Sequence, residues 1–377
     1  MSIENHDFSE LKVAIVHYWL LGMRGGEKVV ESLLKMFPQA VIITHVYDPD
    51  GVSDTIRNQE VRETFIAGLP GARKHYQKYL PLMPLALESM DLQEFDLIIS
   101  SESGPAKGII PRPDAAHICY CHSPMRYIWD QYHVYHGMSG WFNRAAMPLI
   151  AHKMRIWDVS TAARVDRFVS NSRYVAQRIQ TYYRRQADVI PPPVDIDSFQ
   201  PSDTVGSHYL MAGEMVAYKR PDLVIDAFNA SGRKLVVVGG GEMQKGLIAR
   251  AKENITFLGR IPFEELKEQF ANCRALVFPG SEDFGIVPVE VMATGRPVIA
   301  FKQGGALDTV VDGQTGVFFD EQSAKSLNAS IDRLEAAPLL LDNQAGIRAY
   351  AEQFHEVAFL KSFTRVVRET LASKTLS

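Results

Sequence analysis

The sequence of 377 residues has few of the features that mark specialised protein classes. It holds three cysteines, which excludes a disulfide-stapled scaffold and fits a reducing compartment. No apolar run reaches about 18 residues, so no segment is expected to cross a membrane as a helix. The first ten residues are polar and acidic, unlike a secretion signal. These absences predict a soluble cytoplasmic protein.

Net charge is also small, because 40 Lys and Arg face 44 Asp and Glu. The two halves differ, however: residues 1–187 carry 21 basic and 19 acidic side chains, and the remainder carries 19 and 25. Nine of the eleven histidines lie in the first half. Neither value reaches the strong basic excess typical of nucleic-acid binding. The first half is therefore the better candidate for an anionic surface, and no nucleic-acid partner is expected.

What is abundant is a repeated pattern of short apolar, β-branched runs, each followed by a longer amphipathic stretch. Such runs are typical of strands buried on both faces, and their alternation with helices indicates parallel sheets. The length fits about two domains. The sequence thus predicts an α/β fold with two doubly wound parallel sheets, six strands in each. The expected strands are residues 12–18, 40–46, 96–101, 116–121, 167–171 and 188–190, then 208–212, 234–239, 254–258, 275–278, 297–301 and 316–319.

A proline-rich segment marks the expected boundary between the domains. Four prolines fall between Pro191 and Pro201, and proline interrupts regular structure by fixing φ and removing a donor. We therefore expect one domain over 1–190 and a second over 191–356. Residues 357–372 have the periodicity of one amphipathic helix, with no strand after it.

In doubly wound sheets, ligands bind beyond the carboxyl ends of the strands, so the loops there are the candidate sites. Gly25 and Gly26 follow the first strand and precede a helix, where backbone N–H groups can approach a phosphate. The alternative is a tight strand-to-helix turn. The spacing matches neither the dinucleotide fingerprint nor a Walker motif.

Two glutamates lie eight residues apart in the second half. Glu282 follows a strand and Glu290 falls in the next helix, so both can face one site at different depths. A carboxylate that accepts hydrogen bonds from two adjacent hydroxyl groups commonly holds a ribose or a sugar ring. The alternative is that both are ordinary acids of a helix start.

Lys219 and Arg220 follow the first strand of the second domain and precede a helix expected to begin near Pro221. An ammonium and a guanidinium at a helix N-terminus suit a diphosphate, and the alternative is a solvated surface pair. The loop 239–242 also follows a strand, and its glycines, Gly241 among them, allow close approach of a ligand to the backbone.

His122 falls at the end of a strand of the first domain, where we expect it to face a cleft between the two domains. Neighbouring histidines and cysteines do not have the spacing of a zinc site, so no metal is expected. Two segments, 73–87 and 140–157, combine aromatic, apolar and basic residues. They suit either an anionic membrane surface or ordinary helix packing with a solvated basic face.

The combined pattern resembles the retaining, nucleotide-sugar-dependent glycosyltransferases of family four. This resemblance covers nearly the whole chain and is most specific in residues 208–320. It is carried by Glu282 to Glu290, which looks like the family motif of two glutamates separated by seven residues, together with Phe284-Gly285, Gly295-Arg-Pro-Val298 and Gly304-Gly305. The resemblance implies the GT-B fold, in which two Rossmann-like domains face a central cleft.

The resemblance also implies roles for individual residues. Glu282 would contact the hydroxyls of the donor sugar, Lys219 the diphosphate, and His122 the transferred sugar near the reacting carbon; these three are the candidate catalytic residues. Glu290 would contact the ribose, and Gly304 and Gly305 would lie close to the donor. The full donor-binding set is Gly25, Gly26, Lys219, Arg220, Gly241, Glu282, Phe284, Gly285, Ile286, Val287 and Glu290. The terminal segment 357–377 would pack on the first domain, which would bind the acceptor.

One residue departs from the family pattern. Family members usually carry arginine directly after the glycine at position 213, and here Glu214, which cannot bind phosphate, stands there. Either Arg220 supplies the missing charge or the diphosphate is held less tightly. Residues 121–127, 217–222 and 282–290 look most like bacterial mannosyltransferases that use GDP-mannose and extend lipid-linked sugars of exopolysaccharide or O-antigen.

We therefore expect a retaining hexosyltransferase that moves mannose from GDP-mannose to a polyprenyl-diphosphate-linked oligosaccharide. It would act as a peripheral protein on the cytoplasmic face of the inner membrane, with no cofactor and no metal. Alternatives are another donor, such as UDP-glucose, and a sugar-nucleotide-binding protein without catalysis, which Glu214 keeps open. A dinucleotide oxidoreductase fits less well, because its glycine spacing is wrong.

Overall fold

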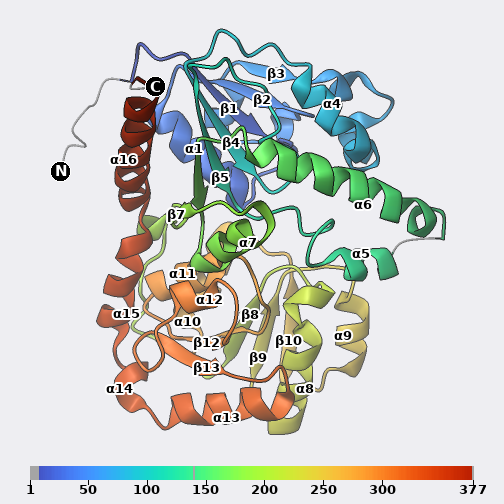
Figure 1. Cartoon of the computed structure of the whole chain (residues 1–377). Helices are drawn as coiled ribbons and strands as arrows, with labels where there is room; N and C mark the ends of the chain where they lie inside the picture. Colours follow the sequence, from blue (N-terminus) through green and yellow to red (C-terminus); the bar gives the residue numbers. More distant parts are fainter. Residues whose placement is uncertain (1–7, 139–140, 376–377) are drawn as a thin grey trace. The chain divides into compact units, whose positions relative to one another are not determined.

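A computed structural model of the chain describes residues 8–138 and 141–375. It divides into two compact units, shown in Figure 1. Unit 1 comprises residues 1–193 and 359–377, and unit 2 comprises residues 194–358. Residues 376–377 of the predicted terminal segment lie outside the described residues.

Unit 1 is built on a seven-stranded parallel sheet with the order β3-β2-β1-β4-β5-β6-β7. Its strands are β1 (Val13–His17), β2 (Val41–Thr44), β3 (Val61–Glu63), β4 (Leu97–Glu102), β5 (Ala116–Cys121), β6 (Arg167–Ser170) and β7 (Ala187–Val189). The predicted count of six was wrong because β3 was missed. This edge strand has three residues, Val-Arg-Glu, which are all partly exposed, and so it leaves no apolar run in the sequence.

Apolar clusters cover the two faces of this sheet, which explains why the central strands read as continuous apolar runs. Alternate residues of β1 point to opposite sides: Val13 and Ile15 join one cluster, while Ala14 and Val16 join another. The helical elements before the domain boundary are α1 (Gly25–Met36), η1 (Pro49–Gly51), α2 (Asp54–Arg57), η2 (Phe65–Gly68), α3 (Ala72–His75), η3 (Tyr76–Leu82), α4 (Met83–Glu88), α5 (Tyr132–Met138), α6 (Trp141–Ala162) and α7 (Arg173–Tyr183).

The last helix, α16 (Glu356–Thr375), packs against this sheet. Phe359, Phe363 and Val366 are buried in the same cluster as Val13 and Ile15. The Phe359 ring meets the ring of Tyr120 on β5 at 5.8 Å between centroids. The apolar stripe of this helix therefore completes one side of the unit 1 core.

Unit 2 has a six-stranded parallel sheet with the order β10-β9-β8-β11-β12-β13. All six predicted strands are present: β8 (Tyr209–Ala212), β9 (Leu235–Val238), β10 (Ile255–Gly259), β11 (Leu276–Phe278), β12 (Val298–Phe301) and β13 (Gly316–Phe319). The connecting helical elements are η4 (Ile196–Ser198), η5 (Ala217–Lys219), α8 (Pro221–Ser231), α9 (Gln244–Arg250), α10 (Phe263–Asn272), α11 (Ile286–Ala293), α12 (Ala306–Thr309), α13 (Ala324–Glu335), α14 (Pro338–Leu341), α15 (Gln344–Ala351) and η6 (Glu352–Phe354). The predicted class, two Rossmann-like parallel-sheet domains, is confirmed.

Candidate functional site

Two predicted residues of unit 2 meet at the carboxyl edge of its sheet. Lys219 ends η5, after β8, and Glu282 lies in the loop after the neighbouring strand β11. The Lys219 Nζ is 3.1 Å from the Glu282 Oε1, and each side chain is about one-fifth exposed, at 19% and 22%. Burial lowers the pKa of Lys219, but the Glu282 carboxylate, Tyr218 and Glu214 together raise it further, so the net pKa is raised. The site therefore presents a charged ammonium and a carboxylate, both still reachable from water.

A glycine pair fixes the backbone under Glu282. The amide of Gly305 donates to the carbonyl of Glu282 at 2.8 Å. Gly304 has a φ of 72°, and a Cβ at this position would lie 2.5 Å from that same carbonyl oxygen. Only glycine combines this backbone conformation with such close approach. The loop after β12 thus positions the loop that carries Glu282.

The residues that follow Glu282 offer a ligand their backbone more than their side chains. Phe284 is buried in the unit 2 core and contacts Phe354 at 5.8 Å between ring centroids. Gly285, with a φ of 88°, is the N-cap of α11, and Ile286 and Val287 are its first two residues. The first N–H groups of a helix lack partners within the helix and favour an anion. Donor-phosphate binding by these residues stays a prediction.

Glu290 lies one turn further along α11, and its side chain is partly buried. Burial raises the pKa of Glu290 to about 7, and the nearby Asp195 carboxylate adds to the rise. This carboxyl is therefore poised to change charge near neutral pH. A ligand hydroxyl or cation beside it would draw it toward the ionised form.

Arg220 is already engaged within unit 2. Its φ of 51° places it in the left-handed region at the start of α8. The guanidinium Nε donates to Asp222 Oδ1 at 3.1 Å, and one Nη donates to Gln322 Oε1 at 3.1 Å. Its predicted contact with a diphosphate would compete with these partners. Glu214, the departure from the family pattern, is exposed.

The glycine loop after β9 packs on the loop after β8. A Cβ at Gly241 would lie 2.5 Å from the carbonyl oxygen of Met215, whose own amide donates to the carbonyl of Gly240 at 2.9 Å. Backbone packing between these loops therefore already requires a glycine at position 241. Donor binding by Gly241 stays a prediction.

In unit 1, three strand ends converge on His122. Its Nε2 is 2.8 Å from Ser101 Oγ, and Ser101 Oγ is 3.0 Å from Nδ1 of His17. His17 ends β1 and is the register partner of Ser101 on β4, while His122 directly follows β5. Burial lowers the pKa of His122 to about 3, with a further contribution from His17, so this imidazole is neutral at physiological pH.

The start of α1 closes this group. Gly25 and Gly26 are its first two residues. A Cβ at Gly26 would lie 2.9 Å from Tyr18 Oη, 3.2 Å from His17 Cε1 and 3.6 Å from His122 Nε2. The close packing of α1 on these three side chains therefore favours glycine at position 26, and donor binding by Gly25 and Gly26 stays a prediction. Glu27, which is buried, accepts from the amide of Arg24 at 3.0 Å.

The segment that carries His122 is clamped from α7. One Nη of Arg178, which is buried, donates to Ser123 Oγ at 2.6 Å, and Asn171 Nδ2 donates to the carbonyl of His122 at 3.0 Å. His17, Ser101 and Arg178 were missed as site residues by sequence reasoning. His17 could have been found from its place at the end of the first strand. No feature of the sequence predicts the contact between Arg178 and Ser123.

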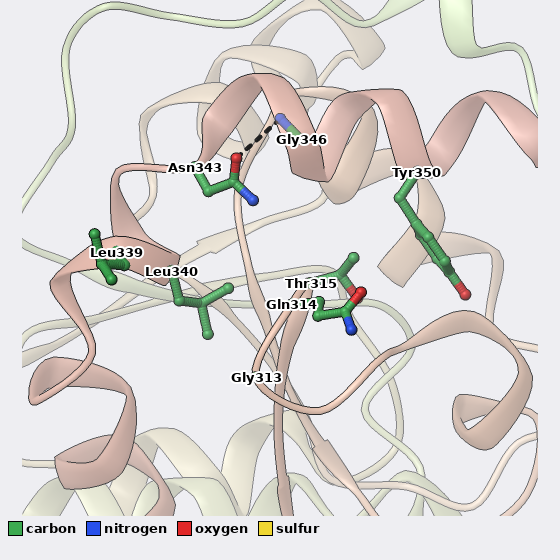
Figure 2. A pocket seen from close by; sticks show the side chains of 8 residues that line it. All are labelled: Gly313, Gln314, Thr315, Leu339, Leu340, Asn343, Gly346 and Tyr350. Atoms are coloured by element: carbon green, nitrogen blue, oxygen red, sulfur yellow. Dashed lines mark hydrogen bonds between the residues drawn. The ribbon is translucent and has the colours of Figure 1, made fainter.

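A separate cavity of about 500 Å³ lies elsewhere in unit 2 (Figure 2). It is lined by Gly313, Gln314, Thr315, Leu339, Leu340, Asn343, Gly346 and Tyr350. Residues 313–315 precede β13, so the cavity lies at the amino end of that strand, away from the edge with Lys219 and Glu282. It contains no predicted site residue.

Over residues 8–138 and 141–375, no group of three or more His, Cys, Asp and Glu side chains is arranged to hold a metal ion. Within the same ranges, no helix combines the length and apolar character that a membrane crossing needs.

The two Rossmann-like domains, together with the loops at the carboxyl edge of each sheet, define a protein of the GT-B class. Two family models match the chain in succession: "Glycosyltransferase Family 4" over residues 23–198 and "Glycosyl transferases group 1" over residues 199–354. The chain belongs to the glycosyltransferases that these two models describe.

Curated relatives carry related names. The chain is 30% identical over 223 residues to a D-inositol 3-phosphate glycosyltransferase of Segniliparus rotundus, covering 51% of this chain and 49% of the relative. It is 29% identical over 199 residues to a GDP-mannose-dependent alpha-(1-6)-phosphatidylinositol monomannoside mannosyltransferase of Mycolicibacterium smegmatis, covering 44% and 52%. The matches thus span about half the length of these relatives.

Solved structures share the fold over nearly all of the chain. Anabaena HepE in complex with UDP-glucose aligns with a TM-score of 0.68 at 17% identity, covering 95% of this chain and 99% of that one. Sucrose-phosphate synthase of Thermosynechococcus elongatus aligns with a TM-score of 0.73 at 17% identity, covering 96% and 100%. At this identity the likeness establishes the GT-B fold alone.

Proposed function

We propose that the protein is a retaining hexosyltransferase that transfers mannose from GDP-mannose to a polyprenyl-diphosphate-linked oligosaccharide. The observation that carries this proposal is the Lys219–Glu282 pair, held at 3.1 Å on adjoining loops at the carboxyl edge of the unit 2 sheet. A cation for phosphate and a carboxylate for hydroxyl groups, side by side, suit a sugar joined to a diphosphate.

The chemistry places each residue at one part of the donor. Departure of the nucleoside diphosphate builds negative charge, which Lys219 and the N-terminus of α11 would neutralise. Glu282 would orient the sugar by accepting from its hydroxyls, and Glu290 would accept from the ribose. The acceptor hydroxyl would attack on the face that the diphosphate leaves and give its proton to a donor phosphate oxygen. Neither a metal nor another cofactor is part of the proposal.

The donor is the first point to test. The mycolicibacterial relative is named for GDP-mannose, which supports that donor, whereas the structurally similar HepE was solved with UDP-glucose, which makes UDP-glucose the second candidate. The experiment supplies labelled GDP-mannose, UDP-glucose and other nucleotide sugars to the enzyme with a polyprenyl-linked acceptor extract. Label in the lipid fraction from GDP-mannose alone supports the proposal, whereas label from UDP-glucose alone overturns the donor assignment.

Two variants test the site. Lys219→Ala and Glu282→Gln should each lower kcat/KM about a hundredfold, in the range seen when one group that stabilises developing charge is removed. Lys302→Ala is the matched control, because Lys302 is an exposed lysine of unit 2 that pairs with Asp320 at 3.3 Å. Full activity of Lys219→Ala and Glu282→Gln would refute the site assignment.

Contact with a membrane surface is part of the proposal, and unit 1 carries the surface that would make it. Residues 64–87 and 131–157 contain no acidic residue. Within them Leu85, Leu149 and Ile156 are 61%, 62% and 59% exposed. The two stretches pack together, since Leu80 of the first joins the apolar cluster of Ala151 and Met154 in the second, and Figure 1 shows α4 and α6 in this part of unit 1.

Exposed apolar side chains in stretches that carry lysines and arginines but no carboxylate favour anionic lipid headgroups. Gly140, in the second predicted segment, lies outside the described residues. The double variant Leu149→Ser, Ile156→Ser should sediment about tenfold less with phosphatidylglycerol vesicles. Leu339→Ser, which changes an 88% exposed leucine of unit 2, is the control and should sediment like the unmodified protein. Equal sedimentation of all three proteins would refute this surface.

A further inference from the structure

The strongest unassigned feature of unit 1 is a buried row of polar groups behind His122. His122 Nε2 contacts Ser101 Oγ at 2.8 Å, and Ser101 Oγ contacts His17 Nδ1 at 3.0 Å. His17 Nε2 in turn faces Glu27 Oε1 at 3.7 Å. His17 and Ser101 are fully buried and Glu27 nearly so, so water does not substitute for these contacts.

At one end of the row, the position of Glu27 favours a negatively charged side chain. Glu27 is held by the amide of Arg24 at the N-terminus of α1, where a negative charge is favoured. At 3.7 Å its carboxylate is too far from His17 for a hydrogen bond. It nevertheless favours a hydrogen over a lone pair on the facing His17 Nε2, because two sets of lone pairs would repel each other. That nitrogen has no hydrogen-bond partner among the described residues.

The positions of the hydrogens on Ser101 and His122 then follow from the position of the hydrogen on His17. A neutral His17 with its hydrogen on Nε2 has a lone pair on Nδ1, so Ser101 must donate to it. Ser101 has one hydrogen, so its oxygen accepts from His122, whose hydrogen is therefore on Nε2. The opposite arrangement would require either a neutral His17 whose Nε2 lone pair faces the Glu27 carboxylate or a fully buried imidazolium at His17, which carries the cost of burying a charge.

We infer that Glu27, through His17 and Ser101, fixes the tautomer of His122 so that Nδ1 is the unprotonated nitrogen available to a ligand. Glu27, His17 and Ser101 are thus positioning residues, and His122 becomes a hydrogen-bond acceptor for a hydroxyl. Such a group suits a sugar hydroxyl and cannot donate to a phosphate. The role of His122 toward a sugar rests on the proposed function, whereas its tautomer does not.

The test reads the tautomer directly. Protein labelled with 15N in the histidine rings is studied by two-bond proton–nitrogen correlation spectra without any ligand, and His122→Ala assigns the signals. The unmodified protein should show a protonated Nε2 and an unprotonated Nδ1 for His122. In Glu27→Gln, whose amide can accept from Arg24 but no longer forces a hydrogen onto His17, the Nδ1-protonated form should become populated.

Activity gives the second readout. Because both tautomers fit the same space, Glu27→Gln should lower kcat about five- to tenfold, the effect of shifting one hydrogen-bond preference, with the donor KM little changed. Glu31→Gln, one turn along α1 where Glu31 pairs with Lys28 at 2.9 Å, is the matched control and should leave both the spectrum and kcat unchanged.

Ser101→Ala provides an independent route should Glu27→Gln not fold, since it interrupts the row at its centre. It should also leave His122 as a mixture of its two tautomers. If His122 keeps the unmodified pattern in either folded variant, the inference is overturned. If the tautomer shifts but no nucleotide sugar is turned over, the proposed function fails and the inference stands.

Discussion

The partly buried Glu290 should make unit 2 less stable as pH rises through the neutral range. Its pKa rises from 4.5 to about 7 in the folded chain, chiefly through burial and then through Asp195. Between these two values the folded state keeps a proton that the unfolded chain has lost. The contribution of Glu290 to the free energy of unfolding therefore falls from about pH 4.5 to about pH 7 and stays constant above that range.

The size of this effect follows from the shift. Each pKa unit corresponds to about 1.4 kcal/mol, so the full shift corresponds to about 3 kcal/mol. Since the side chain is partly exposed, we expect about 2 kcal/mol to be realised. Glu290→Gln removes the titrating group. The variant should thus match the unmodified protein at pH 4.5 and exceed its free energy of unfolding by about 2 kcal/mol at pH 8.

Native-state hydrogen exchange is the suitable measurement. All four tryptophans lie within residues 1–193, so their fluorescence reports unit 1. Exchange of the amides in β8, β9 and β11, corrected for the intrinsic pH dependence of the reaction, reports the stability of unit 2. Taking the difference between variant and unmodified protein cancels other groups that titrate in the same range.

The exposed Glu268 on α10 is the matched control, and Glu268→Gln should show no pH-dependent difference. A Glu290→Gln variant that is equally stable relative to the unmodified protein at pH 4.5 and pH 8 would refute the reasoning. A variant that is less stable at pH 8 would refute it more strongly, because the ionised carboxylate would then be stabilising.

Three further substitutions have expected outcomes. Lys107→Met leaves the buried carboxylates of Glu102 and Asp158 without their shared cation and should cost about 3–5 kcal/mol, read as a shifted denaturant midpoint in tryptophan fluorescence. Phe363→Ala removes a fully buried ring of α16 and should cost unit 1 about 3–5 kcal/mol by the same fluorescence assay. Gly304→Ala places a Cβ 2.5 Å from the Glu282 carbonyl at a φ of 72°, and should cost about 1–3 kcal/mol by unit 2 hydrogen exchange and weaken nucleotide-sugar binding measured by calorimetry.

The sheets could be predicted from the sequence because their strands are covered on both faces. β4 and β5 are buried along their full length and therefore read as apolar runs. β3 could not be found in this way, since an edge strand of three partly exposed residues needs no such run. The location of Lys219 and Glu282 followed from the rule that ligands lie beyond strand ends. That these two side chains pair with each other is a matter of loop geometry, which no spacing in the sequence encodes.

The groups around His122 were harder to predict for a related reason. His17, Ser101 and His122 are separated by 84 and 21 residues, and only the strand order brings them together. The order β1-β4-β5 was not part of the prediction. Arg220 shows a second limit of prediction from the sequence. Its charge is evident in the sequence, but its hydrogen bonds to Asp222 and Gln322 are not.

The discontinuity of unit 1 has a consequence for how the chain folds during synthesis. Residues 1–193 are made before unit 2, but the core they form lacks Phe359, Phe363 and Val366 until the residues beyond 358 are made. Unit 2, which is continuous in sequence, can complete its own core before then. The order of synthesis and the order of completion should therefore be reversed. A released chain that ends at residue 358 should resist proteolysis in unit 2 while residues 1–193 remain open to it.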